Sequence, residues 1–236
     1  GWFTIPVQER QLWVLDQQIN DRGVLLDRRL INNALGIDAV SRERLTAEAV
    51  ALTGLNNPNS AAQLKDWLSA ELSNDSIDDL GIVEKPVTVT TLRKNDLPEL
   101  LASTENVNTK RVLEIRAEMS KTSIKKYASM LKYICTDDRV RGIFQFYGAN
   151  RTGRWAGRGI QPHNLPRISY GKKSRALDLS RTQVLNNEGD ELGLFFNTSD
   201  ALSQLLRTAF VAAPGKRFIV AAFSAIEARV IAWLAG

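Results

Sequence analysis

The spacing of apolar residues along the chain predicts that its first half is helical. In several runs between residues 7 and 134, apolar positions recur every three or four residues, as one face of an α-helix requires. Asp27 precedes the longest early run as an N-cap, and Ser60 follows a turn-forming stretch as another. We expect helices over residues 7–20, 28–52, 61–72, 97–102 and 107–134.

The pattern changes in the second half of the chain. One run alternates apolar and polar residues, which is typical of a half-buried strand, and a later run is continuously apolar, as in a strand buried on both faces. Ser224 and Glu227 form a capping-box pattern before a last apolar run. We expect strands over 140–147 and 217–223, and helices over 177–187, 199–210 and from Ser224 onward.

Composition narrows the class of protein. The chain has 236 residues, 44% of them hydrophobic, enough for one large domain or two small ones with a real core. No apolar run approaches the roughly 18 residues that cross a membrane, so we expect no membrane partner.

A single cysteine, Cys135, excludes a disulfide framework and predicts a reducing compartment, the cytoplasm of the cell or of a viral host. From its first and last residues, we expect the chain to be part of a longer polypeptide.

Positive charge is concentrated in one segment. The formal net charge of the chain is +5, whereas residues 139–181 hold ten Lys and Arg residues against one acid, Asp178. Aromatic residues and glycines are interleaved with these cations. Cations neutralise phosphates, and glycine lets the backbone approach a polyanion closely. The segment therefore predicts a nucleic-acid partner, the alternative being a solvated basic face.

Three blocks of sequence, which together span nearly the whole chain, are more specific than composition. They are LDQQINDRGVLLDRRL (15–30) with NPNSAAQL (57–64), TGR (152–154) with QPHNLP (161–166), and FIVAAFSAIEAR (218–229). In this order they resemble the family A DNA polymerases, of the bacterial polymerase I type, and among them the bacteriophage branch. The resemblance implies an α+β fold, with a helical thumb over residues 1–135 and a partial palm with a small antiparallel sheet over 136–236.

The resemblance also implies roles for individual residues. Arg154 resembles the arginine that reaches the minor-groove edge of the primer–template duplex, where the acceptors are common to all base pairs. Glu227, in the block that looks like motif A of the palm, resembles the steric gate against a ribose 2′-hydroxyl, and Arg229 follows it. Solvent-exposed or salt-bridged side chains are the alternative for these cations. The other DNA contacts expected are Thr152, Gly153, Arg158, Gln161, His163, Asn164 and Arg207, with Lys121, Ser123 and Lys126 on the thumb.

Metal chemistry is where this sequence departs from the family. Phosphoryl transfer to a primer 3′-oxygen uses two Mg²⁺ ions held by carboxylates at a strand end. The resemblance assigns one such Asp to the position of Ala222, whose side chain cannot bind a cation. It assigns the backbone carbonyl of Phe223 to the same metal site. After Asp200 the only acid is Glu227, and the fingers have no counterpart. We expect Mg²⁺ to be a cofactor of the intact family enzyme and this chain to bind none.

The sequence thus predicts a fragment of a DNA-directed DNA polymerase that binds primer–template DNA. By resemblance, the intact enzyme adds dNTPs to a primer 3′ end, and this chain alone is expected to be inactive. The alternative is a non-catalytic DNA-binding or assembly module, such as one half of a split polymerase that needs a complementary chain. A single-subunit RNA polymerase would share the palm, but the carboxylate of Glu227, pressing on C2′, favours deoxyribose.

Overall fold

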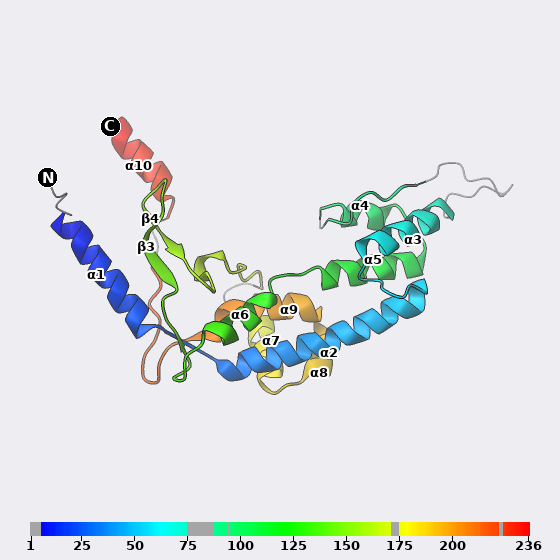
Figure 1. The fold of residues 1–236 in the computed structure, drawn as a ribbon, viewed down its shortest axis with the longest axis horizontal. Helices are drawn as coiled ribbons and strands as arrows, with labels where there is room; N and C mark the ends of the chain where they lie inside the picture. Colours follow the sequence, from blue (N-terminus) through cyan, green and yellow to red (C-terminus); the bar gives the residue numbers. More distant parts are fainter. Residues whose placement is uncertain (1–5, 75–86, 94, 171–174, 222–223) are drawn as a thin grey trace.

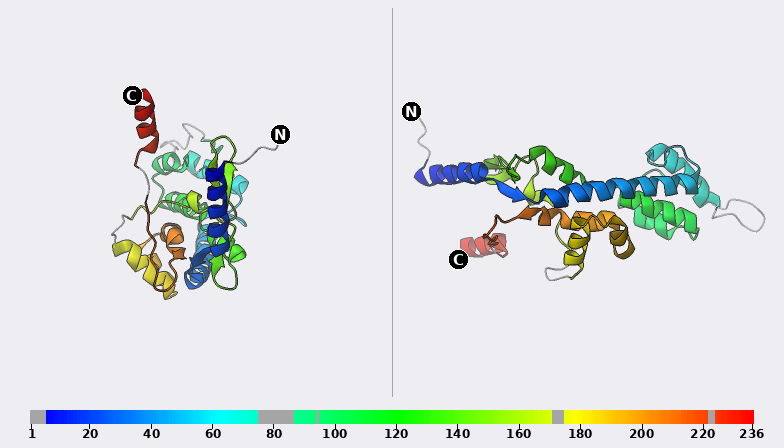
Figure 2. Two further views of the ribbon diagram at one scale, coloured as in Figure 1. Left: turned by 90° about the vertical axis from the view of Figure 1, so that its left-hand side faces the viewer. Right: turned by 90° about the horizontal axis from the view of Figure 1, so that it is seen from below.

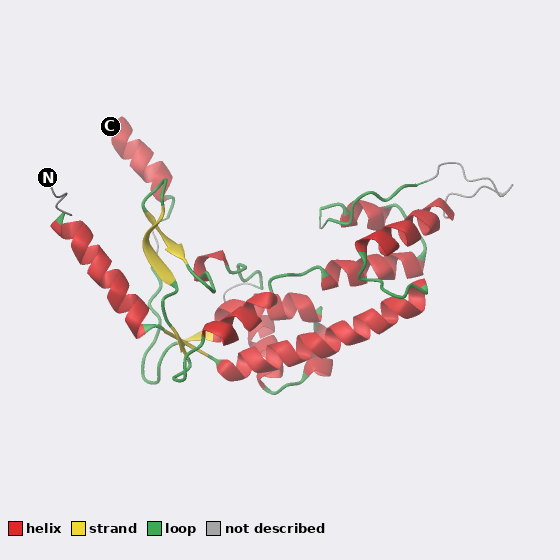
Figure 3. Ribbon diagram, in the orientation of Figure 1, coloured by secondary structure: helices red, strands yellow, loops and turns green. Residues whose placement is uncertain are grey.

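A computed structural model describes residues 6–74, 87–93, 95–170, 175–221 and 224–236. Most of these residues are helical, and the strands among them form two small antiparallel sheets (Figure 3). The α+β fold class predicted from the sequence is confirmed. The elements are α1 (Val7–Arg22), β1 (Val24–Leu26), α2 (Arg28–Thr53), α3 (Ala61–Asn74), α4 (Leu97–Ala102), α5 (Val107–Met119), α6 (Lys125–Tyr133), β2 (Arg139–Val140), β3 (Phe144–Ala149), β4 (Arg154–Gly157), the 3₁₀ turn η1 (Pro162–Asn164), α7 (Arg175–Leu185), α8 (Gly189–Phe195), α9 (Thr198–Leu205), the 3₁₀ turn η2 (Leu206–Ala209), β5 (Phe210–Val211) and α10 (Ile226–Ala235).

Helix α2, with 26 residues, runs along the long axis of the molecule (Figure 1). It begins where the sequence predicts, because the carboxylate of Asp27 accepts a hydrogen bond from the backbone N–H of Leu30 at 3.0 Å. The other carboxylate oxygen of Asp27 accepts from Arg181 of α7 at 2.7 Å. Gly36 lies inside α2, and a Cβ added there would meet nothing within 4 Å.

The larger hydrophobic core surrounds the first half of α2. Helices α6, α7 and α9 pack against this half, and Tyr127 of α6 is fully buried, with its hydroxyl donating to the backbone oxygen of Leu202 at 2.8 Å. Burial raises the pKa of the Tyr127 phenol above its usual value. The core includes Leu26, Leu30, Ile31, Ala34, Ile37, Ile124, Tyr127, Met130, Val140, Ile143, Ile160, Val184, Leu202 and Leu205.

A second core lies at the other end of α2. Helices α3, α4 and α5 enclose it, and a small cluster of Leu45, Ala49 and Ile115 joins α5 to α2. An ion pair reinforces this junction, because the guanidinium of Arg111 donates to both carboxylate oxygens of Glu48, at 2.6 and 2.9 Å. The second core contains Leu64, Leu68, Leu72, Val89, Leu92, Leu97, Val112 and Leu113.

The three-stranded sheet has the order β2-β1-β5 and brings together distant parts of the sequence. Val24 of β1 is opposite Val140 of β2, and Leu25 is opposite Val211 of β5, both antiparallel. The sheet lies where α2 begins, and the larger core contains residues from both sides of residue 135. The division into a thumb and a palm at this residue stays a prediction.

Two arms project from α2 on the same side, one near each end (Figure 1). The hairpin arm comprises α1, β3, β4 and α10, and the tip arm comprises α3, α4 and α5. Seen from below, the molecule remains elongated, and α7 and α8 lie on the same side of α2 as α9 and α10 (Figure 2). No helix among the described residues combines the length and apolarity that a membrane crossing needs.

The prediction of one long helix over 107–134 is wrong, because α5 ends at Met119 and α6 begins at Lys125. The last carbonyl of α5 finds a donor outside the helix, because Arg42 of α2 donates to the backbone oxygen of Met119 at 3.1 Å. Arg42 also donates to the backbone oxygen of Lys121, just beyond the helix, at 3.4 Å. The polar residues between the two helices then turn toward α9, where Ser123 and Ser203 are joined by a hydrogen bond of 2.9 Å.

The predicted strands and the last cap are also corrected. The strand expected over 140–147 is divided between β2 and β3, and residues 217–221 form no strand. In the described part of the chain no strand pairs with residues 217–221, so they are exposed, Val220 to 91%. Helix α10 is present, but its N-cap is Ala225, in the left-handed region with φ 49°, and no side chain caps it.

We expect Glu48→Gln to destabilise the protein at pH 7 by up to about 1 kcal/mol, the usual limit for a partly exposed ion pair. The hydrogen bonds from Arg111 lower the pKa of Glu48 below its ordinary value of 4.5. The contribution of the pair is therefore fully present above about pH 4.5 and is lost as pH falls through the lowered pKa of the folded state. Urea unfolding of both proteins between pH 7 and pH 3 measures this, and a stability difference that is independent of pH would contradict it.

Candidate nucleic-acid interface

The TGR residues stand at the turn end of hairpin β3–β4. Phe144 is opposite Gly157 and Ala149 is opposite Arg154, so β3 contains two more residues than β4 between these pairs. A bulge at Tyr147, whose φ is 54°, takes up the difference. Arg154 is therefore the first residue of β4, directly after the turn.

The backbone conformation of the turn explains why the TGR motif contains a glycine. Gly153 has φ 65°, a left-handed conformation that costs a residue with a side chain about 1–2 kcal/mol. A Cβ at this position would also lie 2.8 Å from the ring of Tyr147. Thr152 precedes it as an exposed turn residue, and its backbone N–H donates to the oxygen of Ala149 at 3.0 Å. The motif thus fixes a tight turn that presents Arg154.

The structure brings Arg154 and Glu227 together. The guanidinium of Arg154 lies 3.2 Å from a carboxylate oxygen of Glu227, although the two residues are 73 positions apart. Both side chains remain largely exposed, at 69% and 79%. The side chain of Arg229 points back toward the start of α10, where its Nε donates to the backbone oxygen of Ser224 at 2.9 Å. Two blocks that sequence analysis treated separately therefore meet at one place.

The QPHNLP element follows the hairpin as a loop. His163 is exposed, and its ring covers Gly157 of β4 so closely that a Cβ there would lie 2.3 Å from the imidazole. Asn164 is also exposed and donates to the side-chain oxygen of Gln161 at 3.3 Å. Arg158 is exposed at the end of β4. These four predicted residues and the TGR turn therefore belong to one continuous part of the hairpin arm.

Two other predicted DNA contacts are bonded to this loop from the core side. Arg207 donates to the backbone oxygens of Leu165 and Pro166, at 2.7 and 2.8 Å. Lys126 of α6 donates to the backbone oxygen of Ile160 at 3.1 Å. Each of these cations satisfies carbonyl groups that the loop itself leaves without partners. In this structure they hold the loop in place.

The remaining predicted thumb contacts lie between α5, α6 and α9. Lys121 forms an ion pair with Asp200, and Ser123 is hydrogen-bonded to Ser203. Both side chains are half-buried. The structure therefore places Lys121 and Ser123 at the junction of three helices, apart from the TGR turn.

The basic segment divides into paired and exposed cations. Arg141 is bidentate to Asp137, at 2.8 and 2.6 Å, which lowers the pKa of that carboxyl, and Arg139 donates to the backbone oxygen of Gly23 at 3.2 Å. Arg181 holds Asp27, as described above. The cations that are exposed and make no side-chain bond to the described residues are Arg151, Arg158, Arg167 and Arg175.

Metal binding has little support in the donors present. Ala222 and Phe223, the positions assigned to the metal site, lie outside the described residues. Among the described residues no three His, Cys, Asp or Glu side chains form a group that could hold an ion. Ala222 has no side-chain oxygen, so this position contributes no carboxylate to a Mg²⁺ site.

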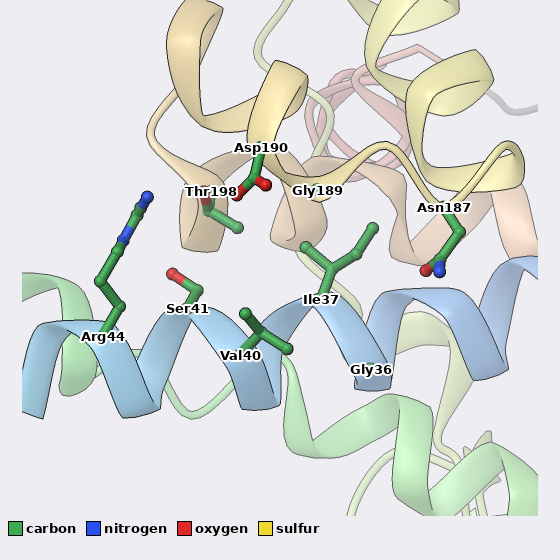
Figure 4. A pocket seen from close by; sticks show the side chains of 9 residues that line it. All are labelled: Gly36, Ile37, Val40, Ser41, Arg44, Asn187, Gly189, Asp190 and Thr198. Carbon is green, nitrogen blue, oxygen red and sulfur yellow. The ribbon is translucent and has the colours of Figure 1, made fainter.

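A cavity of about 280 Å³ lies elsewhere, between α2 and the beginnings of α8 and α9 (Figure 4). Ser41 and Arg44 of α2 lie across from Asp190 and Thr198 in this cavity. None of the residues predicted for the site lines it. The lining residues are Gly36, Ile37, Val40, Ser41, Arg44, Asn187, Gly189, Asp190 and Thr198.

Sequence analysis missed the residues that attach the hairpin to α1. Asp16 and Asn20 of α1 contact Trp155 of β4 and Phe144 of β3. The available signal was a pair of polar residues, four positions apart, within an otherwise apolar stripe.

The chain is similar to a protein of Bacillus phage SP02 named DNA polymerase. The two are 48% identical over 229 residues, which are 97% of this chain and 33% of that protein. The chain thus spans about a third of the length of this relative. No protein-family model matches the chain. No solved structure matches it.

We expect Arg207→Ala to loosen the loop at 158–166, because two backbone oxygens lose their donor, at a cost of about 1–3 kcal/mol. Hydrogen exchange followed by mass spectrometry should show faster exchange in this loop. Arg207→Lys keeps the charge but replaces the planar guanidinium with a single nitrogen, and should give an intermediate effect. Exposed Arg29 of α2 gives the matched control, Arg29→Ala. Unchanged exchange in the loop of Arg207→Ala would show that the two bonds do not hold it.

Proposed function

We propose that the chain is part of a DNA polymerase of the family A type and supplies a surface that holds the primer–template duplex. The likeness to the phage DNA polymerase over nearly the whole chain carries the proposal, since it includes all three blocks of motifs. In a nucleotidyltransferase of this kind, the intact protein adds dNTPs to a primer 3′ end. The assignment of residues 1–135 to a thumb and 136–236 to a palm is part of the proposal.

The hairpin turn supports a role in minor-groove contact. Arg154 is exposed at the end of a tight turn, and its present partner, Glu227, is itself exposed and easily exchanged for another acceptor. In the minor groove, the acceptors N3 of purines and O2 of pyrimidines occur in every base pair. An arginine there therefore binds according to the geometry of the base pair and not according to its sequence. Thr152, Gly153, Gln161, His163 and Asn164 would line the same contact.

The distribution of charge supports phosphate contact around this turn. Arg151, Arg158, Arg167 and Arg175 are exposed, and each would neutralise a phosphate with release of counterions. The hairpin arm and the tip arm project from the same side of α2, which would allow a duplex to touch both (Figure 1). Arg207, Lys126, Lys121 and Ser123 would contribute chiefly by holding the loop and helices on which this surface is built.

Glu227 and Arg229 would act where the incoming nucleotide meets the primer end. In our proposal Glu227 is the steric gate that favours dNTPs over ribonucleotides. Its contact with Arg154 supports a position for this gate beside the proposed minor-groove contact. Mg²⁺ would supply charge neutralisation and activation of the primer 3′-oxygen in the intact family enzyme. Because Ala222 provides no ligand, we assign no catalytic step to a metal held by this chain.

Ala222 also favours a second candidate function. A chain that keeps the surrounding motif but lacks the carboxylate is suited to hold DNA without extending it. It would then be a non-catalytic DNA-binding or assembly module, such as one half of a split polymerase completed by a complementary chain.

We expect the chain to bind a labelled primer–template duplex more tightly than single-stranded DNA, with affinity that falls steeply as salt rises. Arg154→Ala should weaken duplex binding by about tenfold, within the range of about 1–3 kcal/mol for an arginine at a base edge. Fluorescence anisotropy over a salt series measures both effects, with Arg29→Ala as a control for loss of one exposed charge. Equal affinities for Arg154→Ala and the parent would remove Arg154 from the interface.

We also expect no Mg²⁺-dependent primer extension by this chain, because the position assigned to the metal-binding Asp carries Ala222. Extension is followed on a denaturing gel at protein concentrations that saturate the duplex, with an active polymerase as a control for the substrate. Robust extension that is abolished by a chelator would overturn the claim of inactivity and would leave the binding proposal intact.

A further inference from the structure

The one buried residue of α1, a helix described over its whole length, is an acid. Asp16 is 2% exposed, whereas the apolar residues Leu12, Trp13 and Leu15 are each at least 39% exposed. Taking a carboxylate out of water is costly unless hydrogen bonds replace those of the solvent. Burial of Asp16 therefore needs specific partners, and their identity indicates what the residue does.

Asp16 is surrounded by N–H donors. One carboxylate oxygen accepts a hydrogen bond of 2.7 Å from the indole Nε1 of Trp155 in β4. The other accepts from the side-chain amides of Gln17 and Asn20, at 3.0 and 3.2 Å. Among the described residues no Lys, Arg or His forms an ion pair with it. Hydrogen bonds to a charged acceptor are the stronger kind, so Asp16 holds the indole firmly.

One turn further along α1, Asn20 holds the other strand of the hairpin. Its amide nitrogen donates to the backbone oxygen of Phe144, and its amide oxygen accepts from the backbone N–H of the same residue, both at 3.0 Å. The side chain thus pairs with β3 as a neighbouring strand would. Together, Asp16 and Asn20 fix both strands of the hairpin to one face of α1.

Trp155 connects this attachment to the TGR turn. It follows Arg154 directly in β4, and successive side chains of a strand point to opposite faces. The ring of Phe146 packs edge-on against Trp155, with centroids 5.2 Å apart, but ring packing alone leaves the direction of the indole N–H open. The bond to Asp16 selects that direction and so sets how β4 is rotated about its axis. The rotation of β4 in turn decides where Arg154 points.

We infer that Asp16 is a positioning residue for Arg154, acting through the indole of Trp155. The inference rests on the proposed function, because it concerns the residue assigned to the minor-groove contact. It explains why a buried carboxylate stands in α1 at a position where helix packing alone would favour an apolar residue.

The test uses the full chain and measures affinity for the primer–template duplex by anisotropy. Asp16→Ala removes the acceptor, and Trp155→Phe removes the donor but keeps a ring to pack against Phe146. Each should weaken binding by about tenfold, the loss expected when the Arg154 contact is no longer in place. Asp21→Asn, an exposed acid on the same helix, is the matched control and should leave affinity unchanged. Circular dichroism confirms that every variant is folded.

A double-mutant cycle of Asp16→Ala with Arg154→Ala separates a positioning role of Asp16 from a general loss of structure. Asp16→Ala should cost about tenfold in the parent and less than about twofold when Arg154 is already Ala, because the contact it positions is then absent. Equal losses in both backgrounds would overturn the inference.

Hydrogen exchange over 144–157 gives a readout that needs no DNA. Asp16→Ala should speed exchange in this hairpin by about tenfold relative to Asp21→Asn, and leave α5 unchanged. If Arg154→Ala alone has no effect on binding, the proposed minor-groove contact fails, and hydrogen exchange then decides the positioning inference by itself. Unchanged exchange in the hairpin would refute it.

Discussion

Burial of the apolar stripe along α2 is the constraint on which the rest of the structure depends. A helix of 26 residues is too long to be covered by one neighbour, so its two halves are buried in different clusters. Leu30, Ile31 and Ala34 require α6, α7 and α9 around them, whereas Leu45 and Ala49 require α5. Each partner packs apolar side chains against its part of the stripe, and together they remove the stripe from water. The bases of both arms are therefore fixed by one helix.

Local signals in the sequence were sufficient for most helices, but elements that depend on distant partners were not predictable. Asp27 caps α2 as its side chain and position suggest, since capping involves only the next three residues. The break after Met119 depends on Arg42 of another helix, and the apolar stripe continues past it as though one helix were present. The three residues of β1 are too few to show a period, and their partners come from far along the chain. The apolar run at 217–221 has strand composition without a partner strand among the described residues.

The candidate site shows the same division between local and distant information. TGR and QPHNLP are adjacent in the folded chain, as their short separation suggests, and the turn needs its glycine. A basic side chain has the same sequence signature whether it binds a phosphate or a carbonyl, so the bonds of Arg207 and Lys126 to the loop were not foreseeable. The attachment of Trp155 to Asp16 joins residues 139 positions apart, which no pattern within a helix or strand reveals.

Gly36 of α2 stands where packing does not require a glycine. A side chain would fit at this position without a clash, yet glycine lowers helix stability by about 1 kcal/mol relative to alanine. With a rise of about 1.5 Å per residue, the far end of α2 lies about 25 Å from Gly36, so a bend of about 5° there moves that end by about 2 Å. Such a displacement is as large as the difference between a hydrogen bond made and one lost. A small bend at Gly36 would therefore change the spacing between the bases of the two arms.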